Sequence, residues 1–597
     1  MILRKCFTIL LLSLAATVYA KETIPEWAAG AVWYQIIPER FRNINPSDDP
    51  IKSRVVGEDI DDWQVHPWAS DWYKLQVWEE ARHLPFAEIV ADRRYGGDLI
   101  GVIEKLPYLK DFGVDVICLT PIFESPSVEK YDASTFHHVD NNFGLKRDED
   151  WKSMLSEDEN PENWQLTTAD EALIDLLKQA HELEMRVVIE VVFSYCGLEF
   201  WAFKDLEENQ EESKYKDWFD VLRWDDPMTP DTVEFDYKSW QGDRDLPVFK
   251  KTADGDLVEP VRKYIFDSTR RWMDPDSDRV VIDGVDGWLV NEVADLPAKF
   301  WAEWNDLVHS FNPDALTISD YSADAKVVRR QQFDLVRDQT VSNRMVDFFI
   351  HKRGESLSAF MKNLKVVGES RSDRETFSML NQLDSHRTYR IASLIVNANS
   401  GAADGVSADN GYHHYNPIKP DSTQRKIQKL LTLFQLTYPG APVIFYGDES
   451  GMWGGEYPDN IKPMLWREFI YEKEAYTTIW GELTVESSSV FDRDIFNLYR
   501  KMNRVRRDNP ALRVGQLQVH IADDDSQVLV YSRKHKRNEV YVFMNLSSVQ
   551  RHVELRPGWR KNLKVRDPFS KGKYKLDIFD IKFDLEPFSY RVLIKKK

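Results

Sequence analysis

Eight short runs rich in apolar and β-branched residues recur along this chain, and helical stretches separate several of them. These runs occupy residues 31–38, 114–122, 185–193, 284–293, 315–320, 344–350, 378–386 and 442–449. Strands that alternate with helices are typical of a parallel sheet, because each parallel connection needs a crossover segment. Eight such strands predict an α/β chain folded as a (β/α)8 TIM barrel.

The lengths of the connections predict where the chain departs from a simple barrel. About 90 residues separate the third run from the fourth, so we expect a subdomain inserted at 197–255. A second long insertion, at about 49–94, follows the first run. From residue 513 apolar and polar residues alternate, which indicates a C-terminal antiparallel β-sandwich domain at 513–597. The barrel then takes residues 21–512.

The first 20 residues have the pattern of a signal peptide, because Arg4 and Lys5 precede an apolar run that ends in Val18-Tyr19-Ala20. We expect cleavage and a secreted or periplasmic protein with no membrane span thereafter. A permanent membrane anchor is the weaker alternative, since the run is shorter than the ~20 residues that a spanning helix needs.

Composition limits the partners and the redox chemistry. The net charge of -21 disfavours nucleic acid, whose phosphates bind basic surfaces. Aromatic residues form 13% of the chain, which permits carbohydrate binding without demonstrating it. Cleavage of the leader would leave Cys118 and Cys196, too few for a disulfide framework. One disulfide between them stays open, although Cys118 in an apolar run is typical of a buried thiol.

Several long motifs give the chain a family resemblance. They include VWYQIIPERFRN from Val32, YGGDLIGVIEKLPYLKDFGVDVICLTPIFESPS from Tyr95, YDASTFHHVD from Tyr131, DGVDGW from Asp283, FYGDESGMWGG from Phe445 and PDNIKPMLW from Pro458. In these motifs and their order the chain resembles glycoside hydrolase family 13, the alpha-amylase family, and within it the neopullulanase and cyclomaltodextrinase-like branch. The resemblance implies the same barrel, inserted subdomain and C-terminal β domain.

The resemblance also implies where catalytic groups would lie. Retaining hydrolysis needs a carboxylate nucleophile, after strand four in this family, and a carboxylic acid, after strand five. Asn291 stands at the first position, and its amide cannot form the usual glycosyl ester. Asp320 stands at the acid position but is one methylene shorter than the expected Glu. Arg387 replaces a third carboxylate and Leu289 replaces an arginine, so the supporting charges are reversed or lost.

The positions that hold sugar in the family are partly retained. Tyr131, Asp132 and His386 match the family pattern, whereas Tyr195 stands where a sugar-binding histidine is expected. Glu129 likewise replaces a histidine after strand two. We expect Tyr131, Asp132, Tyr195 and His386 to bind substrate, with a structural role for His386 as the alternative.

A shifted alignment offers other carboxylates as catalytic groups. Glu292 follows Asn291, and Asp384 precedes Ser385. Because successive strand residues point to opposite faces, Glu292 and Asp384 should face the surrounding helices instead of the substrate. A rescued active site of this kind is therefore the weaker alternative.

Two oxygen-rich segments are candidate calcium sites. The resemblance implies calcium between the segment after strand one and a Gly-Gly-Asp loop, and hard oxygen ligands suit that ion. The matching residues are Asn43, Asn45, Asp48, Asp49, Gly96 and Asp98. An ordinary Asx-rich turn is the alternative. The second segment, 274–278, alternates aspartates like the start of a calcium loop, but Arg279 occupies the usual glycine position, which favours a simple loop.

These observations support three hypotheses about function. The leading one is a secreted alpha-amylase-family protein that binds alpha-glucan or maltooligosaccharide, or a protein partner, with impaired catalysis. The second is an active alpha-glucan hydrolase or transglycosidase that uses Asp320 with a non-standard partner. The third is a structural role unrelated to sugar. Turnover and binding of maltooligosaccharides distinguish the three.

Overall fold

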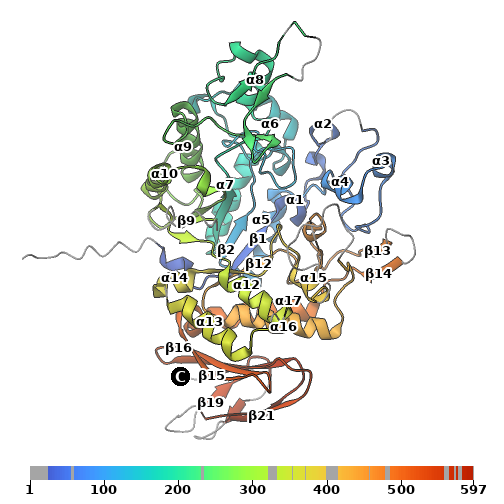
Figure 1. Ribbon diagram of the computed structural model, residues 1–597, viewed down its shortest axis with the longest axis vertical. Coiled ribbons are helices and arrows are strands. Elements are labelled where there is room, and N and C mark those ends of the chain that lie inside the picture. The colour runs from blue at the N-terminus through green and yellow to red at the C-terminus, as the bar shows by residue number, and fades with distance from the viewer. Residues whose placement is uncertain are drawn as a thin grey trace, which may run out of the picture.

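The computed structural model contains the expected eight-stranded parallel sheet (Figure 1). It describes residues 24–55, 60–226, 228–229, 234–320, 332–351, 354–369, 371–398, 415–455, 457–477, 484–556, 564–570, 573–575 and 581–595. The strands are β1 (Trp33–Ile36), β2 (Val116–Leu119), β3 (Arg186–Val191), β8 (Gly287–Val290), β9 (Leu316–Ser319), β10 (Leu335–Val336), β11 (Leu380–Gln382) and β12 (Ala441–Phe445). Their order is β10-β9-β8-β3-β2-β1-β12-β11, which confirms the (β/α)8 barrel fold.

The sixth strand does not lie at residues 344–350, where it was expected. Residues 344–350 lie in helix α12 (Thr340–Val346) and the π-helical turn Asp347–His351 that follows it. The buried side chains of Val341, Met345 and Phe349 recur every four residues, which is a helical spacing. The sixth strand is instead the two-residue β10, which pairs with β9. Arg337 directly follows β10 and therefore lies at the carboxyl end of the sheet.

Both faces of the barrel strands are buried, which explains why their sequences are almost continuously apolar. Inside the barrel, Trp33, Cys118 and Leu289 belong to one cluster with the inward side chains of the other strands. On the outer face, Ile189 and Trp288 join the larger core beneath the helices. The strand ends are therefore fixed by packing from two sides.

In the described part of the chain, long helices accompany the barrel and its C-terminal extension. They are α5 (Leu99–Phe112), α7 (Thr168–Glu182), α9 (Glu259–Met273), α10 (Ala298–Phe311), α13 (Leu357–Glu369), α16 (Ser422–Thr437) and α17 (Arg493–Asp508). Shorter helices are α1 (Pro38–Phe41), α6 (Arg147–Met154), α14 (Asp373–Ser378), α15 (Ile391–Val396) and α18 (Pro510–Val514). Polar caps fix several starts, since Asp98 accepts from Gly101 N in α5, and Thr167 and Asp170 form a capping box at α7.

Two insertions extend from the barrel (Figure 1). After β3 the chain forms α8 (Trp201–Asn209) and the short strands β4 (Val221–Arg223), β5 (Asp236–Tyr237), β6 (Ser239–Trp240) and β7 (Asp243–Pro247). After β1 it forms α2 (Lys52–Val55), α3 (Val77–Ala81) and α4 (Phe86–Ala91). The hairpin of β13 (Lys473–Thr477) and β14 (Thr484–Ser488) contacts this second insertion, because Glu472 N donates to Ala69 O.

The C-terminal region is an antiparallel β structure at the opposite end from α8 in Figure 1. One sheet contains β15 (Gln516–Asp523), β16 (Val528–His535), β17 (Asn538–Asn545), β22 (Ser589–Lys595), β19 (Lys564–Arg566) and β20 (Lys573–Lys575). A second sheet pairs β18 (Arg551–Leu555) with β21 (Ile581–Leu585). Side chains of both sheets share one apolar cluster, which is the expected sandwich. The exact domain boundaries at 21–512, 197–255 and 513–597 stay predictions.

Both described cysteines, Cys118 and Cys196, are buried free thiols, so they form no disulfide with each other. The expected signal peptide at 1–20 lies outside the described residues. Within the described segments, none of the helices has the length and apolar character that a membrane crossing needs.

A buried arginine connects the C-terminal sheet to the barrel. Arg533 of β16 is fully buried and donates to Thr437 O at 2.7 Å and Gly515 O at 3.0 Å. Burial lowers its pKa to about 10. Its neighbour Tyr531 also hydrogen-bonds Thr437 through the two hydroxyl groups.

We predict that Arg533→Met lowers the free energy of unfolding by about 2–4 kcal/mol, because two buried carbonyl groups lose their donor. Urea unfolding followed by tryptophan fluorescence measures the change. The matched control is Lys534→Met, since Lys534 is exposed and its replacement should cost less than ~0.5 kcal/mol. Equal midpoints for the two variants would contradict the assigned role of Arg533.

Candidate functional site

A buried carboxylate organises the carboxyl end of the barrel. Glu190, near the end of β3, has no exposed surface. Its Oε1 accepts hydrogen bonds from Tyr131 Oη at 2.9 Å and Asn291 Nδ2 at 2.7 Å. Its Oε2 accepts from Gln35 Nε2 at 3.1 Å. Donors from the ends of β1 and β8 and from the loop after β2 therefore converge on one side chain.

Arg337 completes this network from the sixth strand. Its Nη2 donates to Asn291 Oδ1 at 2.9 Å, and its Nη1 lies 3.7 Å from Glu190 Oε1. The arginine missing at position 289 was expected from the sequence, but Arg337 was not, because strand six was expected at 344–350 and lies at Leu335–Val336. Both ends of the Asn291 amide are thus engaged, one by an anion and one by a cation.

The network has a defined protonation state. Burial alone would raise the pKa of Glu190, but the charge of Arg337 and the other contacts hold it below its ordinary value. Burial lowers the pKa of His386 to about 4. At neutral pH the site therefore contains an ionised Glu190 beside a neutral His386.

Tyr131, His386 and Arg387, all singled out from the sequence, lie together at this network. Tyr131 Oη lies 3.0 Å from His386 Nε2, so the structure brings both of these side chains together with Glu190. The guanidinium of Arg387 lies over the Tyr131 ring, 4.9 Å from its centroid. Burial raises the pKa of Glu129 to about 7, and the charge of Arg387 opposes that shift. The two replaced positions, 129 and 387, thus carry opposite charges within electrostatic reach of each other.

Asp320 lies at the end of β9 and is 9% exposed. Its carboxylate accepts from Glu292 N at 3.2 Å and Val293 N at 3.5 Å. Burial raises its pKa, and Arg337 is the strongest opposing influence. Arg337 therefore acts on Asp320 as well as on Asn291. The described residues show no hydrogen bond between Asp320 and Asn291.

Glu292 does not obey the expected strand alternation. The strand ends at Val290, and Glu292 takes a left-handed φ of 54° before a short 3-10 turn. Burial raises the pKa of Glu292, as does the neighbouring charge of Asp320. Its backbone therefore leaves the strand geometry on which the alternation depends, and its carboxyl group is near enough to Asp320 for that charge to affect its pKa. Asp384 does turn away, because its Oδ2 accepts from Ile391 N at 2.7 Å.

Tyr195 lies between the barrel and the inserted subdomain. It is 4% exposed and packs against Trp240 of β6, with ring centroids 5.1 Å apart. Trp240 Nε1 and Ser194 Oγ both donate to Asp295 Oδ2, at 3.2 and 2.9 Å. These contacts tie the subdomain to the loops after β3 and β8, and they leave Tyr195 little surface for a ligand in this conformation.

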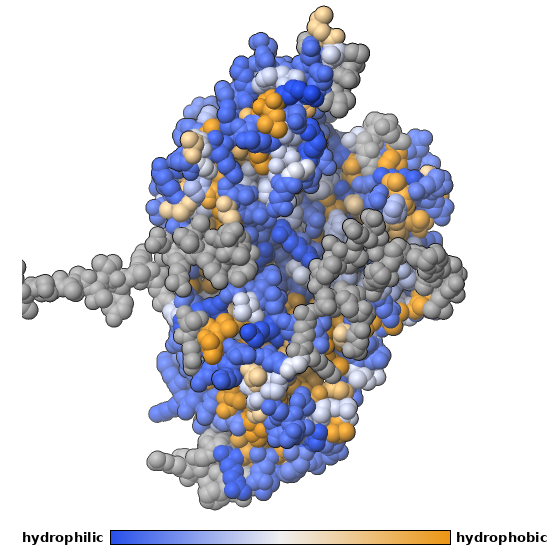
Figure 2. Space-filling view, viewed as in Figure 1, coloured by the Kyte–Doolittle hydropathy of each residue, from blue (hydrophilic) through white to orange (hydrophobic). Residues whose placement is uncertain are grey.

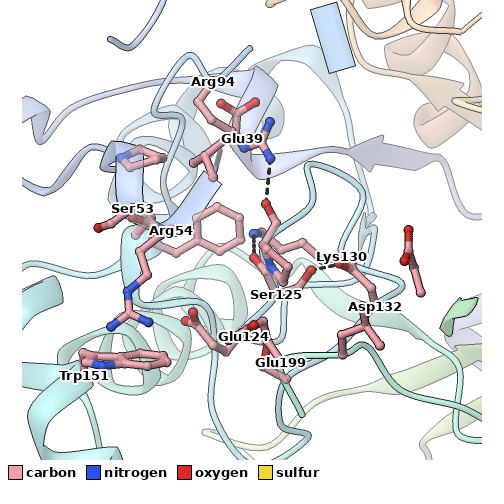
Figure 3. Close-up of a pocket in the computed structure, with 18 of the residues that line it drawn as sticks. Glu39, Ser53, Arg54, Arg94, Glu124, Ser125, Lys130, Asp132, Trp151 and Glu199 are labelled. Carbon is pink, nitrogen blue, oxygen red and sulfur yellow. Dashed lines mark hydrogen bonds between the residues drawn. The ribbon is translucent and has the colours of Figure 1, made fainter. Parts of the chain in front are cut away.

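Asp132 faces a different space from Tyr131. Its Oδ1 accepts from Ser125 Oγ at 2.6 Å, and it lines a cavity of about 620 Å³ (Figure 3). Arg54 stacks over Trp151 at one side of this cavity, with its guanidinium carbon 3.3 Å from the ring centroid. The cavity lies between the insertion after β1 and the loops after β2 and β3. Hydrophilic side chains dominate the face of the molecule in Figure 2.

Part of the expected calcium site has the character of a cation site. Asn43 Nδ2 donates to Asp49 Oδ1 at 2.6 Å, whereas Asn43 Oδ1 is buried with no hydrogen-bond partner among the described residues. Burial raises the pKa of Asp49 to about 7. A Cβ at Gly96, whose φ is 71°, would lie 2.0 Å from Asp49 Oδ1, so only glycine leaves this space open. Asn43, Asp49 and Gly96 fit a hard cation.

The other expected ligands have structural partners. Asp98 caps α5 and its Oδ2 accepts from Ile44 N and Asn45 N at 3.0 and 3.1 Å. Asn45 Oδ1 accepts from Ser47 Oγ. Asp48 accepts from Arg147 N at 3.0 Å through both oxygens. These side chains shape the loop around Asn43 and Asp49.

The second aspartate segment also brings its carboxylates together. Asp274, Asp276, Asp278 and Asp283 can each place an oxygen within 4.8 Å of the others. Both oxygens of Asp274 accept from Arg279 N at 3.2 Å, as expected for a loop that closes on itself. The sequence interpretation of this segment as a loop is compatible with that bond.

Comparisons with known proteins agree with this architecture. The family model described as alpha amylase, catalytic domain, matches residues 35–161 and 167–515. A cyclomaltodextrinase of Thermoanaerobacter pseudethanolicus is 28% identical over 89% of this chain and 72% of its own length. Neopullulanase 2 of Thermoactinomyces vulgaris is 29% identical over 93% of this chain and 74% of its own length.

Solved structures show the same fold. The ligand-free cyclic alpha-maltosyl-(1→6)-maltose hydrolase of Arthrobacter globiformis has a TM-score of 0.67 at 22% identity, with 96% of this chain and 100% of that chain covered. A solved cyclomaltodextrinase has a TM-score of 0.65 at 25% identity, with 96% of this chain and 79% of that chain covered. With a family model that covers most of its length and a barrel of the same topology, the chain belongs to the alpha-amylase family.

Proposed function

We propose that this protein binds alpha-glucan or maltooligosaccharide at the barrel mouth and has little or no hydrolytic activity of the ordinary retaining kind. The observation that carries the proposal is the position of Asn291 between Glu190 and Arg337, with hydrogen bonds of 2.7 and 2.9 Å. An amide held in this way has neither a negative charge nor a free oxygen for attack on an anomeric carbon. The names of the relatives support an alpha-glucan as the ligand.

Charge at the site gives further support. A retaining glycosidase stabilises an oxocarbenium-like transition state with carboxylates. Here Arg337 lies beside Asn291, and Arg387 stands where the family resemblance places a third carboxylate. Positive charge at these places raises the energy of a cationic transition state. Tyr131 keeps a half-buried ring that suits a sugar, whereas binding through the buried His386 and Tyr195 would need these side chains to become exposed.

One observation favours an active enzyme as the second candidate. The charge of Asp320 raises the pKa of Glu292, and burial raises the pKa of both carboxyl groups. A carboxyl group with a raised pKa suits general-acid catalysis. In this alternative Asp320 protonates the leaving oxygen and Glu292 is its non-standard partner.

We further propose a structural calcium ion held by Asn43, Asp49 and the Gly96 carbonyl, with Asn45, Asp48 and Asp98 around them. The buried, unpartnered Asn43 Oδ1 is the supporting observation. Secretion or periplasmic export through a cleaved leader at 1–20, and a protein partner, are also proposals.

We predict that the purified protein hydrolyses maltoheptaose and starch at least ~10³-fold more slowly than a working amylase, because the covalent step lacks its nucleophile. Reducing-end assays at high protein concentration measure the rate. Asp320→Asn and Glu292→Gln, prepared identically, expose contaminating amylase. Robust turnover by the wild type that disappears in either variant would establish the enzyme alternative.

Asn291→Asp alone should not restore hydrolysis. The new carboxylate would lie against Glu190 at about the present 2.7 Å contact, where two negative charges disfavour each other. Arg387 would also remain in place. Recovery of amylase-like rates by this single change would show that Asn291 was the only defect.

Arg337→Met should weaken maltooligosaccharide binding about 10-fold, since loss of one buried charged hydrogen bond costs roughly 1.5–3 kcal/mol, only part of which reaches the ligand. Arg337→Lys should give an intermediate loss, because lysine keeps the charge but not the planar fork. Isothermal titration with maltoheptaose measures both. Arg344→Met on α12, outside the network, is the matched control and should bind like the wild type.

Calcium should raise the thermal unfolding midpoint, because a ligand that binds only the folded state stabilises it. Scanning fluorimetry with calcium and with chelator measures the difference. Asp49→Asn should remove most of the shift, whereas Asp274→Asn should keep it. An unchanged midpoint in chelator, with no copurified metal, would contradict the calcium site.

A further inference from the structure

A pair of adjacent histidines lies outside the barrel mouth, in the loop after β2. His137 Nε2 and His138 Nε2 both face Glu157 Oε2, at 3.2 and 2.6 Å. Glu157 belongs to the segment between α6 and α7, so the contact joins two separate loops. The side chains of all three residues are almost completely buried.

The opposite edge of each imidazole ring is fixed by an oxygen atom. His138 Nδ1 lies 2.7 Å from Asp170 Oδ2, and His137 Nδ1 lies 2.7 Å from Tyr264 Oη. Asp170 is itself held by backbone donors and by Arg271. Metal-binding histidines commonly have this arrangement, in which an oxygen acceptor on one nitrogen orients the other toward the ion.

The ring positions are also set by stacking. His137 stacks on Trp164 with centroids 4.2 Å apart and an interplanar angle of 8°. The other carboxylate oxygen of Glu157 is also held in place, because Oε1 accepts a hydrogen bond from Gln165 N at 2.8 Å. The Nε2 atoms and Glu157 Oε2 therefore converge without needing a large change in any side chain.

The three ligand atoms all lie within 4.8 Å of one another. Ligands at about 2.0–2.2 Å from a tetrahedral zinc ion stand roughly 3.4 Å apart. Glu157 Oε2 lies 3.2 and 2.6 Å from the two Nε2 atoms, which is close to that spacing. A cavity of about 570 Å³ adjoins the group and is lined also by Trp201, Lys214 and Tyr215.

We propose that His137, His138 and Glu157 bind zinc or a chemically similar divalent transition metal ion, with the fourth ligand position open to the cavity. Two imidazole nitrogens and one carboxylate oxygen form a ligand set that zinc accepts. Calcium takes oxygen ligands, so this site is chemically distinct from the proposed calcium site. The ion would link the loop after β2 to the segment before α7.

The experiment uses the full-length protein without a histidine tag, with calcium present throughout. Cobalt is titrated as an optical probe and then displaced with zinc. We expect one strong cobalt site per chain with the visible absorption of a four-coordinate ion. Glu157→Gln should weaken zinc binding at least ~10-fold. Asp158→Asn, a carboxylate change in the lining of the same cavity, should leave it unchanged.

Failure to bind either ion stoichiometrically would overturn the proposal, and so would equal zinc affinity in the wild type and Glu157→Gln. If Glu157→Gln does not fold, zinc-edge X-ray absorption of the wild type identifies the atoms that bind the ion. Two imidazole nitrogens at about 2.0–2.1 Å are expected, and a shell of oxygen ligands alone would overturn the assignment.

Discussion

The burial of Glu190 is the constraint on which the barrel mouth depends. An ionised carboxylate with no exposed surface is costly unless donors and cations surround it. The chain supplies Gln35, Tyr131 and Asn291 as donors and Arg337 as the nearby cation. These residues come from distant parts of the sequence, so the same charge that needs them also fixes the strand ends relative to one another.

This requirement is compatible with the residues at the positions that the family resemblance aligns with catalytic groups. Aspartate at position 291 would place a second anion against Glu190, whereas an amide can donate to Glu190 and accept from Arg337. Arg337 then supplies, from strand six, a positive charge that position 289 no longer carries. The opposite charges at positions 129 and 387 follow the same rule, because each limits the cost of burying the other. This ion network is the basis of the proposed binding role.

Much of the fold could be predicted from the sequence, because buried parallel strands leave long apolar runs. Seven of the eight runs overlap the observed strands. The sixth failed because β10 has only two residues, while the more apolar 344–350 forms a helix. That error hid Arg337. The alternation rule does not apply at Glu292, because the strand ends at Val290 and Glu292 takes a left-handed backbone conformation. Neither the two-residue strand nor the left-handed residue can be recognised from composition or motif spacing.

The buried carboxylates of Glu157 and Glu190 have different partners, and this difference favours a metal ion at Glu157. At Glu190 the protein's own donors take up both oxygens, and Arg337 supplies the countercharge. At Glu157 one oxygen faces two imidazole nitrogens whose other edges are already fixed, beside a cavity with room for a further ligand. Imidazole can give a lone pair as well as a proton, unlike guanidinium. An ion can therefore replace the protons that the two imidazoles share with Glu157, whereas the guanidinium of Arg337 leaves no such position at Glu190.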